Sequence, residues 1–180
     1  TAGSSDPDYN GANEILVCKL DPSASALLAS TFVGGSYQDD PEGIFLGPGG
    51  YVHVVGKTWS NDFPTDLPDP SPTDDRDVVL VTLDHDLSRL VYSERFGGNQ
   101  SEEPYYGLHV DAEGLATFVG RTESPDLPVT SGAYCETYVP AARPDTFVMR
   151  VRTDAAAPEL ELVSTGPATT GDTFHVRVRA

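Results

Sequence analysis

An internal repeat limits the folds open to this chain more than any other property of its sequence. The apolar segment Glu14–Asp21 recurs as Asp77–Asp84, and the two copies stay in register through glycine pairs that begin at Gly34 and Gly97. A fixed period of about 63 residues is typical of proteins built from similar units, because one small unit cannot bury its own apolar face and stacks on its neighbours. We therefore expect a tandem array of equivalent units.

The second half of the repeat supports the same alignment. One extra residue stands near Tyr106, after which Gly49–Thr58 aligns with Glu113–Thr122. Both copies then close on a pattern in which Thr, Ser, Asp and Pro recur, Thr58–Pro64 in the first and Thr122–Pro128 in the second. Each copy thus runs from an apolar beginning to a shared polar ending.

The local sequence within each repeat predicts β-strands. Four short segments rich in Val, Leu, Phe and Tyr are separated by Asp-Pro-Ser, Pro-Gly-Gly or Ala-Glu-Gly turns, and no stretch keeps a helical period. A repeated unit of four strands is typical of a propeller blade, which is a small twisted antiparallel sheet. We expect an all-β fold of tandem four-stranded antiparallel propeller-like blades, with the Pro- and Asp-rich stretch Asp62–Arg76 linking one blade to the next.

Four regions follow from this period. Residues 1–13 are expected to be the end of a preceding repeat or an extended arm, residues 14–76 the first β-repeat, and residues 77–144 the second. Residues 145–180 form a divergent partial repeat or the start of a second β-sandwich-like segment, in which Phe174–Arg179 alternates apolar and basic residues as an edge strand would. Closed propellers have about four to eight blades, so we expect the ring to be incomplete.

The charge of the chain excludes several partners. It has 11 Lys and Arg against 28 Asp and Glu, a net charge of −17. Proteins that bind nucleic acid or anionic lipid headgroups need basic surfaces. No apolar run approaches the roughly 20 residues that span a bilayer. We expect no nucleic acid and no membrane span, and an acidic, lysine-poor surface suits a secreted protein.

One local pattern has the chemistry of a calcium loop. Hard oxygen donors recur at alternate positions around Gly11, which allows a tight turn. The glutamate of this pattern aligns with Asp77 and Asp145 in the later repeats, so a metal-free, Asx-rich turn is the alternative. The expected Ca²⁺ ligands are Asp6, Asp8, Asn10, the carbonyl of Ala12, and Glu14.

No catalytic motif is found. The sequence lacks a nucleophile elbow, a P-loop, a dinucleotide fingerprint and an H-E-x-x-H zinc motif. Acidic pairs such as Asp39-Asp40 and Glu102-Glu103 are expected in solvated loops, although two carboxyl groups at a set separation could serve glycoside hydrolysis. We predict no catalytic residues, no organic cofactor and no enzyme activity.

The aromatic residues and cysteines leave alternatives open. A group of four aromatic side chains is expected either to stack against sugars or to fill the blades; it comprises Trp59, Phe63, Tyr105 and Tyr106. Cys18 and Cys135 match no metal or redox spacing. For Cys18 we expect a buried free thiol within an apolar strand, with a disulfide to Cys135 as the alternative.

Three segments together resemble a known repeat family. Lys19–Leu27 contains Leu-Asp-Pro-Ser, Ser30–Ser36 contains the Gly-Gly pair, and Gly56–Pro64 contains Thr-x-Ser-x-Asp-Phe-Pro. This combination resembles the SBBP-type β-propeller repeat of bacterial and archaeal secreted proteins, over about Glu14 to Val151. The resemblance implies a blade scaffold and an extracellular or cell-surface location, and it implies no reaction.

Repeats, charge and resemblance together predict a function without catalysis. We expect a structural or adhesive extracellular module that self-associates as a homo-oligomer or forms part of a larger surface assembly or filament. The alternative is a glycan- or ligand-binding propeller segment appended to a secreted enzyme.

Overall fold

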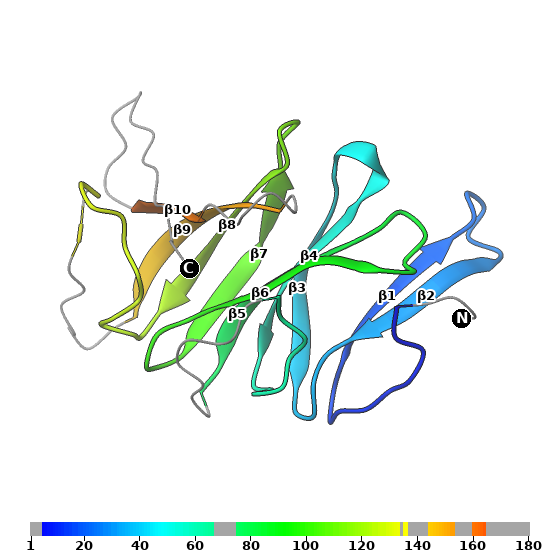
Figure 1. The fold of residues 1–180 in the computed structure, drawn as a ribbon, viewed down its shortest axis with the longest axis horizontal. Helices are drawn as coiled ribbons and strands as arrows, with labels where there is room; N and C mark the ends of the chain where they lie inside the picture. Colours follow the sequence, from blue (N-terminus) through cyan, green and yellow to red (C-terminus); the bar gives the residue numbers. More distant parts are fainter. Residues whose placement is uncertain (1–4, 67–74, 134, 137–143, 154–159, 165–180) are drawn as a thin grey trace.

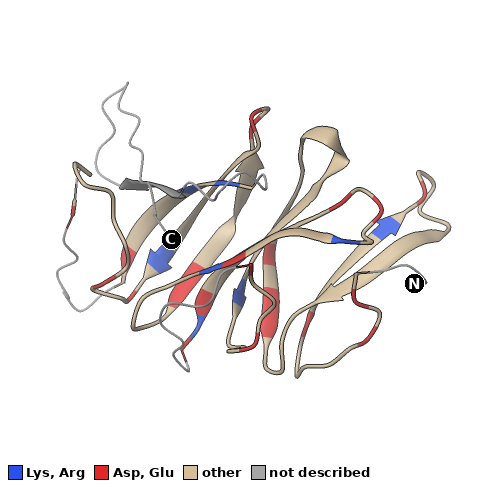
Figure 2. Cartoon of the chain, in the orientation of Figure 1, with Lys and Arg blue, Asp and Glu red and all other residues tan. Residues whose placement is uncertain are grey.

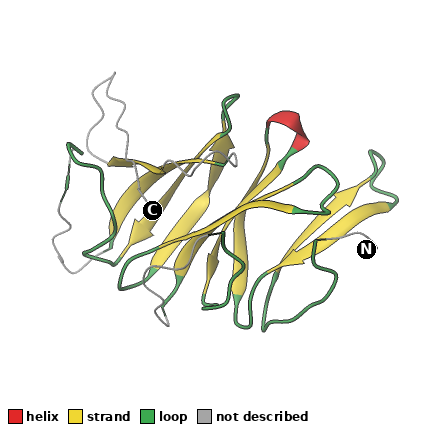
Figure 3. Ribbon diagram, in the orientation of Figure 1, coloured by secondary structure: helices red, strands yellow, loops and turns green. Residues whose placement is uncertain are grey.

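The computed structural model describes residues 5–66, 75–133, 135–136 and 144–153, together with the backbone of residues 160–164. Within these residues the chain is all-β, and the only helical element is the short 3-10 turn η1 (Pro48–Gly50) (Figure 3). The strands are β1 (Ile15–Leu20), β2 (Leu27–Val33), β3 (Asp39–Leu46), β4 (Val52–Thr58), β5 (Asp77–Leu83), β6 (Leu90–Phe96), β7 (Glu102–Val110), β8 (Leu115–Thr122), β9 (Asp145–Arg152) and β10 (Leu160–Ser164).

These strands form three open sheets that follow one another along the molecule (Figure 1). The first is the two-stranded hairpin β1–β2, the second has the order β3-β4-β5-β6, and the third has the order β7-β8-β9-β10. All pairings between these strands are antiparallel. The expected all-β, antiparallel fold is therefore confirmed. The expected strand Phe174–Arg179 lies outside the described residues.

The sheets do not begin where the sequence repeats begin. The middle sheet takes β3 and β4 from the first repeat and β5 and β6 from the second. The stretch Asp62–Arg76, which we expected to link one blade to the next, instead connects β4 to β5 within one sheet, where Val54 lies opposite Val81. The physical reason lies in β5, which is apolar on both faces and therefore occupies the interior of a sheet.

Strand β5 joins the layers, because its side chains alternate between two cores. Val78 and Leu80 pack in the core shared with the third sheet, and Val79 and Val81 pack in the core shared with the hairpin β1–β2. All four are fully buried, and burial of one such side chain is worth about 1.5–3 kcal/mol. The three sheets therefore stack as layers, with the middle sheet covered on both faces.

The Leu-Asp element of each repeat forms the first hairpin turn. The Asp21 carboxylate accepts hydrogen bonds from the backbone of Ser25 (2.6 Å) and Ala26 (2.9 Å). Asp84 accepts the equivalent bonds from Ser88 (2.8 Å) and Arg89 (3.1 Å). An aspartate that satisfies the turn backbone in this way explains why the residue recurs.

Cys18 is exposed, not buried as expected, because Ile15 and Val17 occupy the inner face of β1 and Cys18 points the other way. Cys135 is also exposed, and no disulfide joins the two residues.

Among the described residues, no helix has the length and apolar character needed to cross a bilayer.

Candidate functional site

Each repeat buries a carboxylate at the start of its third strand. On β3 this residue is Asp39, which accepts hydrogen bonds from the hydroxyl of Thr58 (2.5 Å), the backbone of Gly35 (2.7 Å) and the hydroxyl of Ser60 (3.0 Å). Burial raises the pKa of Asp39 above its ordinary value, although these three donors act in the opposite direction and the nearby charge of Glu14 adds to the increase. The carboxylate thus binds parts of its own repeat.

The second repeat builds the same group with a glutamate. Glu102, fully buried on β7, accepts hydrogen bonds from the hydroxyl of Thr122 (2.6 Å) and the backbone of Gly98 (2.9 Å). The expectation that Asp39 and Glu102 lie in solvated loops is wrong. Each accepts a hydrogen bond from a backbone amide of the Gly-Gly loop and from a buried threonine hydroxyl, so its buried carboxylate is satisfied inside the fold.

A second acid holds the other side of each Gly-Gly loop. Asp62 accepts a hydrogen bond from the backbone of Ser36 (2.8 Å), and Asp126 accepts one from the backbone of Asn99 (2.9 Å). A Cβ atom placed on Gly35 would lie 2.5 Å from the Asp62 carboxylate, which requires glycine there. The recurring Thr, Ser, Asp and Gly residues of the repeat are therefore structural.

One of these groups contains two acids and a cation. Asp77, on β5, pairs with Arg95 of β6 (2.6 Å) and also interacts with Glu102. The pKa of Asp77 is raised to about 7, mainly by burial and further by Glu102, although the charge of Arg95 and its hydrogen bond act in the opposite direction. Arg95 also donates to the Ser60 carbonyl (3.1 Å), which ties the two repeats together.

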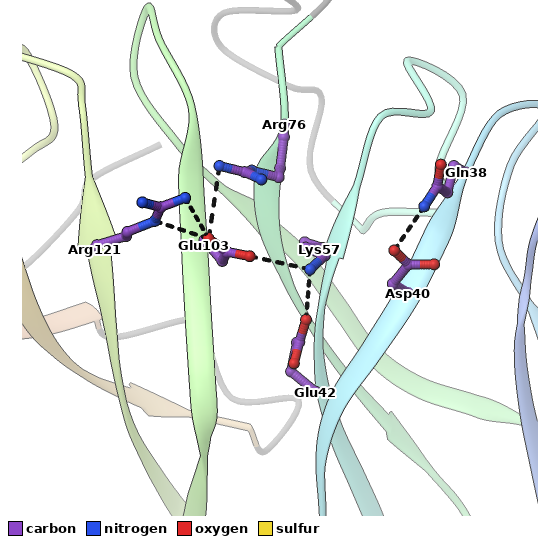
Figure 4. Close-up of polar contacts among 7 residues, drawn as sticks. All are labelled: Gln38, Asp40, Glu42, Lys57, Arg76, Glu103 and Arg121. Carbon is purple, nitrogen blue, oxygen red and sulfur yellow. Dashed lines mark hydrogen bonds and ion pairs between the residues drawn. The ribbon is translucent and has the colours of Figure 1, made fainter. Parts of the chain in front are cut away.

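A second charged cluster, which we call the inter-sheet network, joins the middle and third sheets (Figure 4). Glu103 of β7 contacts Arg121 of β8 (2.6 Å), Lys57 of β4 (3.1 Å) and Arg76 (3.7 Å). Lys57 also binds Glu42 of β3 (2.6 Å), so its ammonium group bridges two sheets. The five side chains are largely buried, and Lys57 contacts both carboxylates.

The inter-sheet network favours the charged forms of Glu103 and Lys57. Burial alone would raise the pKa of Glu103, but the hydrogen bond from Lys57 and the charges of Arg76, Lys57 and Arg121 lower it overall. Burial would lower the pKa of Lys57, but Glu42 and Glu103 raise it overall. A general acid needs a raised pKa, whereas that of Glu103 is lowered. The geometry suits attachment of one sheet to the next.

Sequence reasoning did not identify the inter-sheet network. Its members come from β3, β4, β7, β8 and one loop, and only the stacking of two sheets brings them together. A signal was available, because Lys57 and Arg121 are the same position of successive repeats, as are Asp40 and Glu103. In the first repeat Asp40 instead accepts a hydrogen bond from Gln38 (2.7 Å) (Figure 4).

The expected calcium ligands lie in one loop before β1. There the backbone of Asp8 donates to the Asp6 carboxylate (3.0 Å), and the backbone of Asn10 donates to Glu14 (2.9 Å). These carboxylates thus satisfy the loop itself, as in the Asx-rich alternative.

The remaining ligand, the carbonyl of Ala12, accepts a hydrogen bond from the hydroxyl of Tyr9. In the part of the chain that the structure describes, no group of three or more His, Cys, Asp and Glu residues is placed to hold a metal ion. Calcium binding by the loop stays a prediction.

The four aromatic residues considered for sugar stacking do not gather on one surface. Phe63 is buried in the core between the hairpin β1–β2 and the middle sheet, and the guanidinium of Arg76 lies over the ring of Trp59 (5.8 Å). Tyr105 and Tyr106 are exposed together where the pairing of β7 with β8 is irregular. Of the four, this tyrosine pair is the most exposed to a ligand.

Acidic side chains are spread over the molecule. Figure 2 shows them in turns and on strands of the two four-stranded sheets, with Lys and Arg between them. Neither the protein-family models nor the curated proteins contain a match to this chain.

Proposed function

We propose that this chain is a non-catalytic, extracellular or cell-surface β-repeat module that self-associates or forms part of a larger surface assembly. The observation that carries this proposal is the use of the repeated polar residues. The carboxylates of Asp39 and Glu102 bind backbone and hydroxyl groups of their own repeats, and the charged residues of the inter-sheet network pair with one another. The repeated chemistry serves to stack sheets.

The stacking supports a propeller-like arrangement of SBBP type. Strands β3 and β7, which begin successive sheets, lie close together, and Phe45 contacts His109 between them (5.1 Å between ring centroids). Strands β6 and β10 form the opposite edges of the same sheets. In this proposal β3 and β7 are inner strands near a common axis. Further sheets, from other copies of the chain or from a larger protein of the same repeat, continue the array.

The proposed surface location is supported by charge. A net charge of −17 favours solubility and disfavours nucleic acid and anionic membranes as partners. Within the described strands the β1–β2 sheet has an unpaired edge along β1, which favours association with like sheets, and a homo-oligomer or a larger protein of the same repeat would supply them.

Sedimentation velocity over a range of protein concentrations tests this proposal. A self-associating module gives a sedimentation coefficient that rises with concentration towards a defined assembly. A strict monomer that binds oligosaccharides would contradict self-association and favour the second candidate.

That second candidate is a glycan-binding propeller segment, and the exposed pair Tyr105 and Tyr106 favours it. Tyr106 is 84% exposed on β7, and exposed aromatic rings are the groups on which sugars stack. Titration with oligosaccharides, followed by tyrosine fluorescence, should show saturation that is lost in a Tyr105→Ala, Tyr106→Ala variant if this candidate is right.

A further inference from the structure

Among the described strands, β1 has a neighbour on one side only. In the described chain it pairs with β2, whereas the equivalent strand of the next repeat, β5, pairs with β6 on one side and β4 on the other. Every second residue of an unpaired strand edge directs its N–H and C=O groups outward, where they can pair with another strand. The free edge of Ile15–Leu20 is thus the position that β4 would fill in a complete sheet.

An apolar surface lies beside this free edge. Ile44 and Leu46 of β3 are 65% and 70% exposed. They stand opposite Val54 and Val52 of β4, so they share the face of the middle sheet that the hairpin β1–β2 partly covers. The hairpin therefore covers β4 and β5 and leaves β3 open. We call the free edge of β1 together with Ile44 and Leu46 the hairpin slot.

The next layer of the same molecule shows what covers such a surface. Leu108 and Val110 of β7 are the repeat equivalents of Ile44 and Leu46, and Val110 is only 4% exposed. They pack in a core to which β3 and β4 contribute Phe45 and Val55. The hairpin β3–β4 thus covers Leu108 and Val110 of the third sheet, whereas the equivalent Ile44 and Leu46 of the middle sheet stay exposed.

From this equivalence we propose that the hairpin slot binds a β-hairpin of the same repeat type, supplied by a partner chain. One strand of that hairpin pairs antiparallel with β1, and its apolar residues, equivalent to Phe45 and Val55, cover Ile44 and Leu46. The inference rests on the proposed function, since it names the partner through which the module assembles.

The chemistry of the slot selects this kind of partner. The β1 edge offers backbone hydrogen bonds, which an extended strand satisfies and a helix or a lipid surface does not. No proline interrupts Ile15–Leu20, and Lys19 is the one charged residue within it, so the edge lacks most of the features that protect exposed edges. The exposed Ile44 and Leu46 add specificity for a hairpin with apolar residues at alternate positions.

A peptide with the sequence of Asp39–Thr58 tests the proposal directly, because it is the hairpin that fills the equivalent place one layer on. The expected result is saturable binding to the full chain and slower amide hydrogen exchange in Ile15–Leu20. A chain with Ile44→Asp and Leu46→Asp should bind the peptide at least about tenfold more weakly, because the apolar surface of the hairpin slot is lost. Both positions are exposed, so this variant should keep the thermal transition of the parent chain.

Matched controls separate the slot from other contacts. A Val129→Asp chain changes an exposed apolar residue outside the slot and should bind like the parent. A peptide with Phe45→Asp and Val55→Asp keeps the length of the probe and should not bind. If partner copies already fill the slot, Ile15–Leu20 should be protected without peptide, and the Ile44→Asp, Leu46→Asp change should remove that protection.

The proposal is overturned if Ile15–Leu20 exchanges fast both with and without peptide, or if the two aspartate substitutions leave binding or protection unchanged. Sedimentation separates this failure from failure of the proposed function. A chain that self-associates while its slot stays empty would refute the slot and retain the structural module. A chain that neither self-associates nor binds the peptide would refute both.

Discussion

Asp39 and Glu102 occupy the same place in successive repeats, and each accepts a hydrogen bond from a buried threonine. The hydroxyl of Thr58 lies 2.5 Å from the Asp39 carboxylate, and that of Thr122 lies 2.6 Å from Glu102. Aspartate and glutamate differ by one methylene, yet both reach a glycine amide of the same loop. The repeat therefore preserves a hydrogen-bonding arrangement, and the residue that supplies the carboxylate varies.

Replacing Thr58 with valine should destabilise the chain. The change keeps the shape of the side chain and removes the hydroxyl that donates to Asp39, which leaves a buried carboxylate short of one partner. The expected loss is about 1–3 kcal/mol in the free energy of unfolding, measured by urea denaturation. Thr122→Val should cost a similar amount, because Glu102 loses the equivalent donor. A Thr117→Val control on the outward face of β8 should change little, and equal losses in all three variants would contradict the role of the hydroxyl.

The sequence was sufficient to predict most strands, because their signals are local. The repeat segment Asp77–Asp84 became β5, and Asp145–Val151 became most of β9. It could not predict which strands share a sheet. The hairpins β1–β2 and β3–β4 have equally good local signals, and the choice to pair β4 with β5 depends on covering both faces and both edges of β5.

The site was harder to predict for the same reason. The recurrence of Gly35, Thr58 and Ser60 was visible in the sequence, but their meeting at Asp39 required the fold. Burial was misjudged because an acidic pair such as Asp39-Asp40 is polar in sequence. In the structure one member points inward and is satisfied, and the other stays partly exposed, as alternation along a strand requires.

Removing the central carboxylate of the inter-sheet network should weaken the molecule in a salt-dependent way. Glu103→Gln removes a charge that faces three cations and should cost about 1 kcal/mol in unfolding free energy at low salt. The difference from the parent chain should shrink between about 0.05 M and about 1 M NaCl, because salt screens the lost attraction. Glu113→Gln, an exposed turn residue, is the matched control. A penalty that does not depend on salt would show that the charge of Glu103 is not what matters.

His53 should make stability depend on pH. Burial lowers the pKa of His53 from 6.5 to about 4, so between these values the unfolded chain carries a proton that the folded chain does not. This contribution is complete above pH 6.5 and is lost as the pH falls towards 4. Asp77, with its raised pKa, acts in the opposite direction over the same range, so the test compares the chain with a variant.

The variant is His53→Gln, and the measurement is urea unfolding at about pH 7.5 and about pH 5. On acidification the parent chain should lose up to about 2 kcal/mol relative to the variant, since only the parent has this titrating group. Parallel losses in the two proteins would mean that His53 is protonated alike in the folded and unfolded states.

The loop before β1 is predicted to bind calcium, and a melting experiment decides the matter. Calcium at about 100 times its dissociation constant should stabilise the folded chain by about 2.7 kcal/mol and raise its thermal transition relative to a sample with chelator. Asp8→Ala should abolish the difference, whereas Glu113→Ala should preserve it. An unchanged transition would remove Asp6, Asp8, Asn10, Ala12 and Glu14 as ligands and leave the Asx-rich turn.

Amide hydrogen exchange in the equivalent strands β1 and β5 tests the account most directly. It shows whether the hairpin β1–β2 is one half of a four-stranded sheet whose other two strands are missing. Strand β5 is paired on both edges and buried on both faces, so its amides should exchange slowest in the molecule. In the isolated monomer, about half of the amides of Ile15–Leu20 should exchange much faster, namely those on the unpaired edge of β1. Uniform protection of β1 at the level of β5 in a monomer would contradict the account.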